Sequence, residues 1–185
     1  LERVFTDVRA KNRRVVFAEG EEERTIRAAL AFRNQGLGEP VLIGREDVVA
    51  DAMRNLGHDT TEGLEIHNAR LSQNNARYTD YLYGRLQRQG LMERDCQRMV
   101  NQDRNVFSAC MLACGDADAM VTGLTRSFRV CFDDISRAIG PANGANVMGI
   151  TAINARDRTV IIADTLLNEV PNSEELADIA IQAAQ

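Results

Sequence analysis

The sequence has no long apolar run, no excess of basic residues and no close cluster of cysteine and histidine. No run approaches the ~20 apolar residues of a membrane-spanning helix. Residues 1–14 lack the apolar core of a signal peptide. The 22 basic residues are outnumbered by 27 acidic ones, and the net charge of −5 offers no attractive field to nucleic acid or anionic lipid. We therefore expect a soluble, cytoplasmic protein that binds neither nucleic acid nor membranes.

Known site signatures are also missing. The chain carries no dinucleotide-binding glycine fingerprint, no Walker loop and no Ser-His-Asp set, so we predict no catalytic residue. Cys110 and Cys114 stand one helical turn apart, which leaves a two-ligand metal or redox role open, but His58 and His67 are distant in sequence. Buried, reduced thiols and no metal site are the favoured interpretation, since free cysteine packs as a small hydrophobe. The four cysteines are Cys96, Cys110, Cys114 and Cys131.

From residue 13 onward, short apolar runs alternate with amphipathic stretches, which predicts an α/β sheet covered by helices. We expect strands at 14–18, 40–44, 64–68 and 119–122, and two further strand-like runs at 146–154 and 158–164 around a turn at 155–158. We expect helices at 21–35, 45–57, 76–89, 93–102, 106–114 and 128–139, the helix at 106–114 being apolar enough to be buried. A last helix is capped by Asn172, with Glu175 three residues later.

The strand-helix units end near Gly123, where we place a seam between two lobes. Residues 1–12 then form an N-terminal linker or helix, residues 13–123 the first lobe and residues 124–185 the start of the second. The chain begins with leucine rather than methionine, and its last helix has no glycine, proline or basic turn to end it. We therefore expect a piece of a longer protein, with the second lobe incomplete.

The segment AEGEEER, residues 18–24, places Gly20 between a strand end and a helix start, among four glutamates. It could form a ligand site at the carboxyl end of a strand, where open α/β sheets bind ligands. We favour the alternative that Glu21, Glu22 and Glu23 complement the positive N-terminus of the helix, because so acidic a cluster would repel phosphate. Gly20 is expected to meet a backbone requirement.

The segment VTGLTRSFRVC leaves a buried strand through a glycine and enters a helix. Its backbone amides, with Arg126, Ser127 and Arg129, could gather around an anion such as a phosphate. Alternatively, both arginines pair with acids of the following helix, such as Asp133 and Asp134. The residues alone do not decide between these two interpretations.

A third segment, ADTLLNEVPNSEEL, places Asp164 and Thr165 just after a buried strand, another common position for functional groups. Asp164 is also an ordinary turn former, and we favour that interpretation. Both residues remain candidates for ligand binding.

Four segments resemble the phosphate acetyl/butyryltransferase family in order and spacing: RVVFAEGEEERTIRAA, PVLIGR, FSACMLACGDADAMVTGLTRSFRV and IADTLLNEVPNSEELADIAIQAA. The resemblance extends from residue 13 to residue 185. It implies a three-layer α/β/α fold of the isocitrate/isopropylmalate dehydrogenase-like (phosphotransacetylase) type, with two lobes and truncated at the C-terminus. It also implies homodimers that form through the second lobe.

Within this family, the chain resembles in particular the domain fused behind the catalytic part of bacterial NADP-dependent malic enzymes. Working acetyltransferases usually carry S-G-A-x-H-S/T-T-A-D-T-x-R-P here, whereas this chain has Arg126 for the histidine, Phe128 for the threonine, Val130 for the aspartate and Asp133 for the arginine. The last exchange reverses a charge expected to help hold phosphate or coenzyme A. The family's later serine-arginine and aspartate catalytic positions lie beyond Gln185.

The resemblance therefore implies a regulatory and oligomerisation domain of a malic enzyme, which decarboxylates malate oxidatively to pyruvate with NADP. The domain would bind acetyl-CoA or a related acyl-CoA as an allosteric effector, through Arg126, Ser127, Arg129, Asp164 and Thr165, and would lack transferase activity. It would need no cofactor itself, because NADP and a divalent metal, Mg²⁺ or Mn²⁺, belong to the preceding domains. The alternatives are a truncated genuine phosphate acetyl- or butyryltransferase and a purely structural oligomerisation domain.

Overall fold

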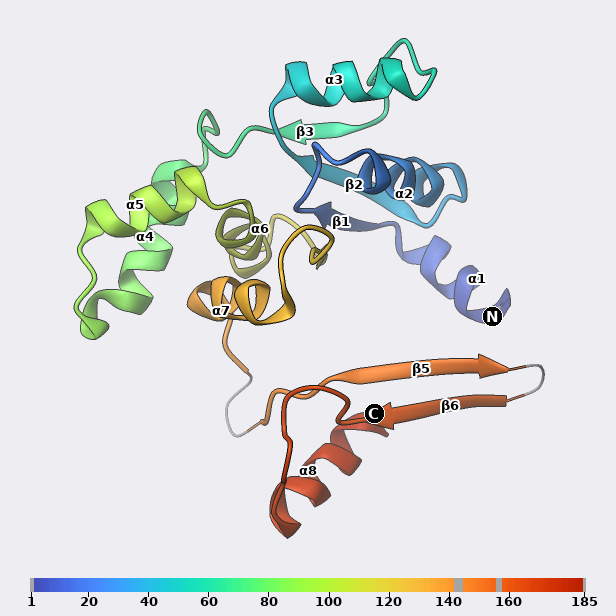
Figure 1. Cartoon of the computed structure of the whole chain (residues 1–185), viewed down its shortest axis with the longest axis vertical. Coiled ribbons are helices and arrows are strands. Elements are labelled where there is room, and N and C mark those ends of the chain that lie inside the picture. The colour runs from blue at the N-terminus through green and yellow to red at the C-terminus, as the bar shows by residue number, and fades with distance from the viewer. Residues whose placement is uncertain (1, 142–144, 156–157, 185) are drawn as a thin grey trace. The chain divides into compact units, whose positions relative to one another are not determined.

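The computed structural model describes residues 2–141, 145–155 and 158–184, which form two compact units (Figure 1). The first unit is Leu1–Ile139 and the second is Gly140–Gln185. Arg156 and Asp157, in the middle of the predicted turn, lie outside the described residues.

The first unit is built on a parallel sheet in which the order of the strands is β3-β2-β1-β4. Parallel neighbours cannot be joined by a tight turn, so helices connect them. The strands lie where the sequence predicts them, with slightly different ends: β1 is Arg13–Phe17, β2 is Gly38–Ile43, β3 is Glu65–His67 and β4 is Ala119–Val121.

Helices cover both faces of this sheet, because side chains alternate between faces along each strand. Val16, Val41 and Ile43 pack into one apolar cluster, and Phe17 and Leu42 into another. The helices α2 (Glu23–Asn34) and α3 (Glu46–Asn55) contribute to the cluster of Phe17, and α4 (Asn75–Leu86), α5 (Glu93–Gln102), α6 (Arg104–Ala113) and α7 (Phe128–Ala138) to that of Val16. The predicted three-layer α/β/α arrangement is confirmed.

The predicted buried helix is α6, whose residues 105–111 are all buried. The Asp103 carboxylate accepts hydrogen bonds from the Asn105 and Val106 amides and so caps its N-terminus. Phe107 meets the Tyr78 ring of α4 edge-on, with 5.2 Å between the ring centres. Burial of a side chain as large as Phe107 stabilises the fold by roughly 1.5–3 kcal/mol, so α6 anchors the helices on this face.

The boundary between the units differs from the seam that we predicted near Gly123. Helix α7 follows that seam, yet it packs against α6 and α4 and buries Cys131 and Ala138. The Tyr81 hydroxyl of α4 donates to the Ala138 carbonyl at 2.7 Å. These contacts place α7 in the first unit, and the boundary between the units along the chain lies after Ile139.

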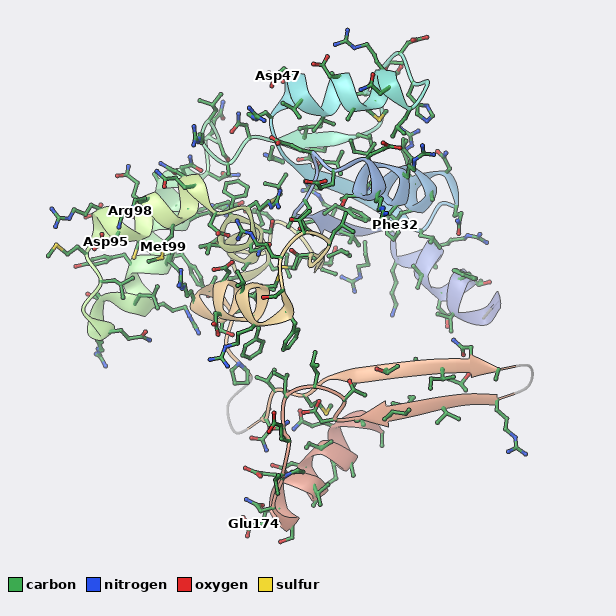
Figure 2. All side chains as sticks on the ribbon, viewed as in Figure 1. Phe32, Asp47, Asp95, Arg98, Met99 and Glu174 are labelled. Atoms are coloured by element: carbon green, nitrogen blue, oxygen red, sulfur yellow. The ribbon has the colours of Figure 1, made fainter. Side chains whose placement is uncertain are left out.

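The outer helices are amphipathic, as the sequence pattern predicts. On α5, Cys96 and Val100 are buried, whereas Arg98 is exposed and pairs with Asp95 at 3.2 Å (Figure 2). The chain begins with helix α1 (Glu2–Lys11), and a short 3₁₀ helix, η1 (Gln87–Gln89), follows α4. No helix in the described ranges combines the length and apolar character needed to cross a bilayer.

The second unit consists of an antiparallel hairpin and one helix. Strands β5 (Ile150–Ala155) and β6 (Arg158–Ala163) pair with each other, and both are exposed along most of their length. Helix α8 (Ser173–Ala183) begins with the predicted capping box: the Asn172 side chain accepts from the Glu175 amide at 3.0 Å, and the Glu175 carboxylate accepts from the Asn172 amide at 2.9 Å. Among the described residues of this unit, Ile179 is the one buried apolar side chain.

Candidate functional site

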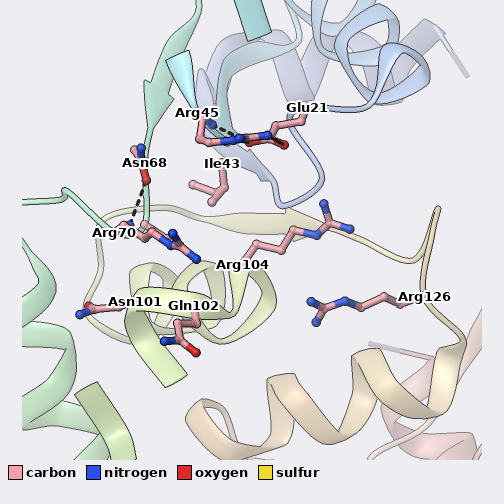
Figure 3. A pocket seen from close by; sticks show the side chains of 11 residues that line it. Glu21, Ile43, Arg45, Asn68, Arg70, Asn101, Gln102, Arg104 and Arg126 are labelled. Carbon is pink, nitrogen blue, oxygen red and sulfur yellow. Dashed lines mark hydrogen bonds and ion pairs between the residues drawn. The ribbon is translucent and has the colours of Figure 1, made fainter. Parts of the chain in front are cut away.

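A hollow of about 310 Å³ lies at the carboxyl edge of the parallel sheet (Figure 3). Its walls come from the ends of β2 and β3, the end of α5, the start of α6 and the loop after β4, all in the first unit. Four arginines line it, Arg45, Arg70, Arg104 and Arg126, against one acid, Glu21. Open α/β sheets bind ligands at this edge, and ligand pockets span roughly 300–1,000 Å³. The hollow is therefore the candidate site, and its arginines favour an anionic ligand.

The single acid of the lining is neutralised by its neighbour. Glu21 accepts hydrogen bonds from both the backbone amide and Nε of Arg45, each at 2.9 Å. The hydrogen bond from Arg45 holds the pKa of Glu21 below its ordinary value, although burial opposes this shift. Because this carboxylate is paired, it does not set a free negative charge against an entering anion.

Arg70 is the least constrained cation of the hollow. It follows β3, and its amide donates to the Asn68 side chain at 3.0 Å, which orients the start of the loop. Its side chain is exposed, and none of the acids in the described ranges pairs with it. Its guanidinium is therefore free to bind a ligand.

Arg104 is the first residue of α6. Its Nη2 donates to the Thr125 hydroxyl at 2.7 Å. Its Nε is buried and has no hydrogen-bond partner within the described part of the chain. The side chains of Arg104 and Arg126 enter the hollow from opposite sides (Figure 3).

Arg126 is at the wall of the hollow, but it is already paired with two acids. Its Nη1 lies 2.6 Å from Asp103 and 2.9 Å from Asp134. Burial lowers the pKa of Arg126, but the hydrogen bond to Asp103 and the charges of both acids outweigh burial and raise it overall. The geometry supports pairing with Asp134, as the second interpretation of this segment has it, and adds Asp103.

The other two candidates of this segment do not line the hollow. Arg129 is exposed on α7 and pairs with Asp133 one turn later at 3.1 Å, so the reversed charge at Asp133 is compensated within the helix. Ser127 immediately precedes α7, and its exposed side chain makes no capping hydrogen bond. Within this segment, Arg126 is the residue that lines the hollow.

The backbone amides of residues 123–125 already have an acceptor within the protein. One of the two interpretations of this segment gathers them around a ligand anion, but in the structure they donate to the carboxylate of Glu19. The anion that they surround therefore belongs to the protein itself.

The acidic segment around Gly20 is divided between several partners. Only Glu23 lies in the first turn of α2, where it pairs with Arg27. Glu21 binds Arg45, which follows β2, and Glu19 binds the loop after β4. The expected backbone requirement at Gly20 is confirmed, since a Cβ there would lie 2.8 Å from the Ile43 carbonyl oxygen.

Asp164 and Thr165 lie in the second unit, whereas the hollow is built from the first alone. The Asp164 carboxylate accepts from the amides of Gly149 at 2.7 Å, Leu166 at 3.0 Å and Asn168 at 2.7 Å. Burial opposes its ionisation, but these hydrogen bonds outweigh burial and hold the pKa of Asp164 far below its usual range. The geometry supports the turn-forming interpretation. The Thr165 amide donates to the Gly149 carbonyl at 3.2 Å.

The whole chain, residues 1–185, matches the family described as phosphate acetyl/butaryl transferase. The chain belongs to this family.

Relatives of this phosphate acetyl/butaryl transferase domain include enzymes of two kinds. The NADP-dependent malic enzyme of Rhizobium meliloti (strain 1021) is 49% identical over 185 residues, which cover 100% of this chain and 24% of that enzyme. A phosphate acetyltransferase of Deinococcus radiodurans is 29% identical over 177 residues, covering 95% of this chain and 25% of that protein. The chain thus spans about a quarter of these relatives, and malic enzymes carry such a domain as part of a longer protein.

A solved structure supports the assignment of the fold. The EutD phosphotransacetylase from Staphylococcus aureus superposes with a TM-score of 0.86 at 25% identity. The match covers 95% of this chain and 53% of that protein. The predicted phosphotransacetylase fold is confirmed.

None of the four cysteines lines the hollow. Cys96, Cys110 and Cys131 are buried free thiols and Cys114 is half-buried. Burial raises the pKa of Cys110 to about 12, which keeps this thiol protonated and unreactive. In residues 2–141, 145–155 and 158–184, no three His, Cys, Asp or Glu side chains group as they would around a metal ion.

The residues that the sequence analysis missed are Arg45, Arg70, Arg104 and Glu19. A signal existed for Arg45 and Arg70, because they lie one and two residues beyond predicted strands of a parallel sheet. Arg104 had none, since it starts a helix and reaches the hollow only through tertiary packing. Glu19 belonged to a segment that we interpreted through its own helix rather than through the loop after β4.

Proposed function

We propose that this domain regulates a malic enzyme by binding acetyl-CoA or a related acyl-CoA, and that it has no transferase activity itself. The parent enzyme would decarboxylate malate oxidatively to pyruvate, using NADP and Mg²⁺ or Mn²⁺ bound in its other domains. The observation that carries the proposal is the arginine-lined hollow at the carboxyl edge of the sheet. Its volume suits a phosphate-bearing end of the ligand, with the remainder lying outside.

Electrostatics support an anionic ligand. The charge of Arg45 is balanced by Glu21 and that of Arg126 by Asp103 and Asp134. Arg70 keeps its charge unpaired among the described residues, and the guanidinium fork suits a phosphate. Removal of the Arg70 side chain should therefore weaken ligand binding without leaving a buried acid unpaired.

The experiment compares Arg70→Ala with Arg129→Ala in the full-length protein. Malic-enzyme activity is measured across an acetyl-CoA series, with the rate without effector as the reference for each variant. Loss of one charge-assisted contact should raise the half-inhibiting concentration about tenfold in Arg70→Ala. Arg129→Ala is the matched control, since it removes an exposed arginine outside the hollow. Equal inhibition of wild type and both variants would place the effector elsewhere.

A genuine transferase is the second candidate, because phosphate acetyltransferases also match this chain. Against it stand Arg126, Phe128, Val130 and Asp133, which replace residues expected in working enzymes of the family. Release of coenzyme A from acetyl-CoA and phosphate by the full-length protein, above a heat-inactivated control, would establish the transferase and overturn the first proposal.

We also propose that the domain helps the parent protein to form homo-oligomers. The support is the exposed apolar surface of the second unit, where Ile150, Ile153, Val160 and Ile161 are each 45–53% exposed. Apolar side chains gathered in this way mark interaction surfaces. Light scattering of the full-length protein at micromolar concentration checks this, and a monomer would contradict it. A purely structural role without a ligand would show as an oligomer whose activity acetyl-CoA does not change.

A further inference from the structure

Glu19 is a buried carboxylate that binds a loop far along the chain. It is the second residue after β1, and it is 2% exposed. One oxygen accepts from the amides of Gly123 at 3.0 Å and Leu124 at 2.6 Å. The other accepts from the amide of Thr125 at 2.8 Å and from its hydroxyl at 2.5 Å, with Arg104 at 3.5 Å. Both oxygens of Glu19 are thus occupied by donors.

Three consecutive amides that converge on one anion form a nest, the arrangement that proteins use to bind phosphate and other anions. Gly123 makes this turn possible, because its φ of +105° is unfavourable for other residues. Burial raises the pKa of Glu19, but the hydrogen bonds of Thr125 and Leu124 and the charge of Arg104 outweigh burial and lower it overall. The carboxylate is therefore ionised at neutral pH and serves as a built-in occupant of the nest.

Glu19 is connected to the hollow without lining it. The Thr125 hydroxyl, which donates to Glu19, accepts a hydrogen bond from Arg104 at 2.7 Å. Arg126 is the next residue after this loop. Two of the four arginines of the hollow are thus held through contacts that begin at Glu19.

We propose that Glu19 is a positioning residue for anion binding: by filling the nest, it fixes the loop of residues 123–125 and so holds Arg104 and Arg126 at the wall of the hollow. The inference rests on the proposed function only for the identity of the natural ligand. Glu19 acts through the loop and through these arginines rather than by touching the ligand.

The test uses Glu19→Ala in the full-length protein, with Glu23→Ala as the matched control. Both remove one glutamate of the same segment, but Glu23 pairs with Arg27 on α2 and touches neither the loop nor the hollow. Hydrogen exchange at residues 123–125 reports the order of the loop. Calorimetric titration with inorganic pyrophosphate reports the affinity of the hollow for an anion.

We expect faster exchange at residues 123–125 and about tenfold weaker pyrophosphate binding in Glu19→Ala, the loss expected for one misplaced charge-assisted contact. Acetate has the size of the deleted group, so it should restore both properties relative to chloride at the same ionic strength. Glu23→Ala should change neither. Wild-type affinity in Glu19→Ala despite fast exchange would reduce Glu19 to a structural role and overturn the inference, and so would a failure of acetate to restore exchange or affinity.

Glu19→Gln keeps the shape of the side chain and removes its charge, so it replaces Glu19→Ala if the alanine variant does not fold. It should bind pyrophosphate more weakly than wild type, because its amide nitrogen cannot accept the hydrogen bonds that one carboxylate oxygen accepts from the loop. It should not respond to acetate, because its side chain still occupies the nest. Wild-type affinity in Glu19→Gln would also overturn the inference. Measurements on the wild type distinguish the two proposals. If the wild type binds pyrophosphate but acetyl-CoA does not change its malic-enzyme activity, the proposed function is wrong. The role of Glu19 is then still tested by the same comparison of variants.

Discussion

The loop after β4 and the loop after β6 are each folded around a single carboxylate. In the first loop, Glu19 binds the amides of residues 123–125 from more than a hundred positions away in the sequence. In the second, Asp164 binds the amides of residues 166–168 that directly follow it. In both, hydrogen bonds outweigh the cost of burial and lower the pKa of the carboxyl group: those of the Thr125 hydroxyl and the loop amides for Glu19, and those of backbone amides for Asp164.

The difference lies in what each carboxylate joins. Asp164 organises its own turn and binds Gly149, the residue before β5, so its influence stays within the β5–β6 hairpin and the turn that follows it. Glu19 joins the end of β1 to the loop after β4, and its side chain is 2% exposed. Where a carboxylate is buried and its partners are distant, local folding of the loop depends on the global fold.

The largest effect that separates the two loops should come from Glu19→Ala. Removal of the buried carboxylate leaves three amides and the Arg104 guanidinium without their anion. Breaking such a buried charged contact costs about 3–5 kcal/mol. Urea unfolding followed by circular dichroism should show this loss in the free energy of unfolding of the first unit. A loss below 1 kcal/mol would mean that water replaces the carboxylate, and the two loops would then not differ.

The second effect is a pH dependence that Glu19 carries and Glu19→Gln lacks. Because the pKa of Glu19 is lower in the folded state than in the unfolded chain, its ionised form stabilises the fold above the unfolded pKa, which is about 4.3. This contribution is lost as the pH falls through the folded pKa. The free energy of unfolding of the wild type should therefore exceed that of Glu19→Gln at neutral pH. This difference should shrink as the pH falls below about 5. Urea midpoints measured from neutral to acidic pH check this, and a constant difference would contradict it.

A smaller and local effect is expected from Asp164→Ala. Its carboxylate acts like a cap for the following amides, and loss of such a cap costs about 0.5–2 kcal/mol. The change should appear as faster hydrogen exchange at residues 166–168, with little change at residues 123–125. Asp164→Asn is the control that keeps one acceptor oxygen and should retain part of the protection. Equal exchange in both regions would show that the loops are coupled.

The smallest effect should come from Arg129→Ala. Its side chain is 84% exposed, and its pair with Asp133 is an i,i+4 contact on the surface of α7. Such pairs contribute little in water. We expect a free energy of unfolding indistinguishable from wild type by the same urea titration, whereas a clear loss would assign Arg129 a structural partner beyond Asp133.

The elements of the fold could be predicted from sequence because their signals are local. The Val-Leu-Ile run of β2, the apolar stretch of α6 and the Asn172–Glu175 capping box each depend on neighbouring residues, and each is present in the structure. The boundary between the units could not be predicted in this way, because the assignment of α7 to the first unit depends on its packing against α4 and α6. Periodicity shows that a helix has an apolar face but does not show which neighbour covers it.

The site could be predicted only in part. Arg126 lines the hollow as expected, and the turn-forming alternative for Asp164 agrees with its hydrogen bonds. One of the two interpretations had the amides of residues 123–125 surround a ligand anion, but the anion that they surround is Glu19, and the sequence alone did not reveal this. Glu19 reaches them because β1 and β4 are neighbours in the sheet, and strand order is a property of the whole chain that no local pattern encodes.

The β5–β6 hairpin has an outer edge on each strand, and no other strand of the described residues pairs with either edge. Rows of amide and carbonyl groups along such edges act as templates on which another chain can add a strand. The apolar sequences ITAIN and TVIIA strengthen this tendency, since β-branched residues favour extended pairing. The isolated domain should therefore be kept in dilute solution, where collisions between hairpins are rare and the growth of fibres through their edges is slow.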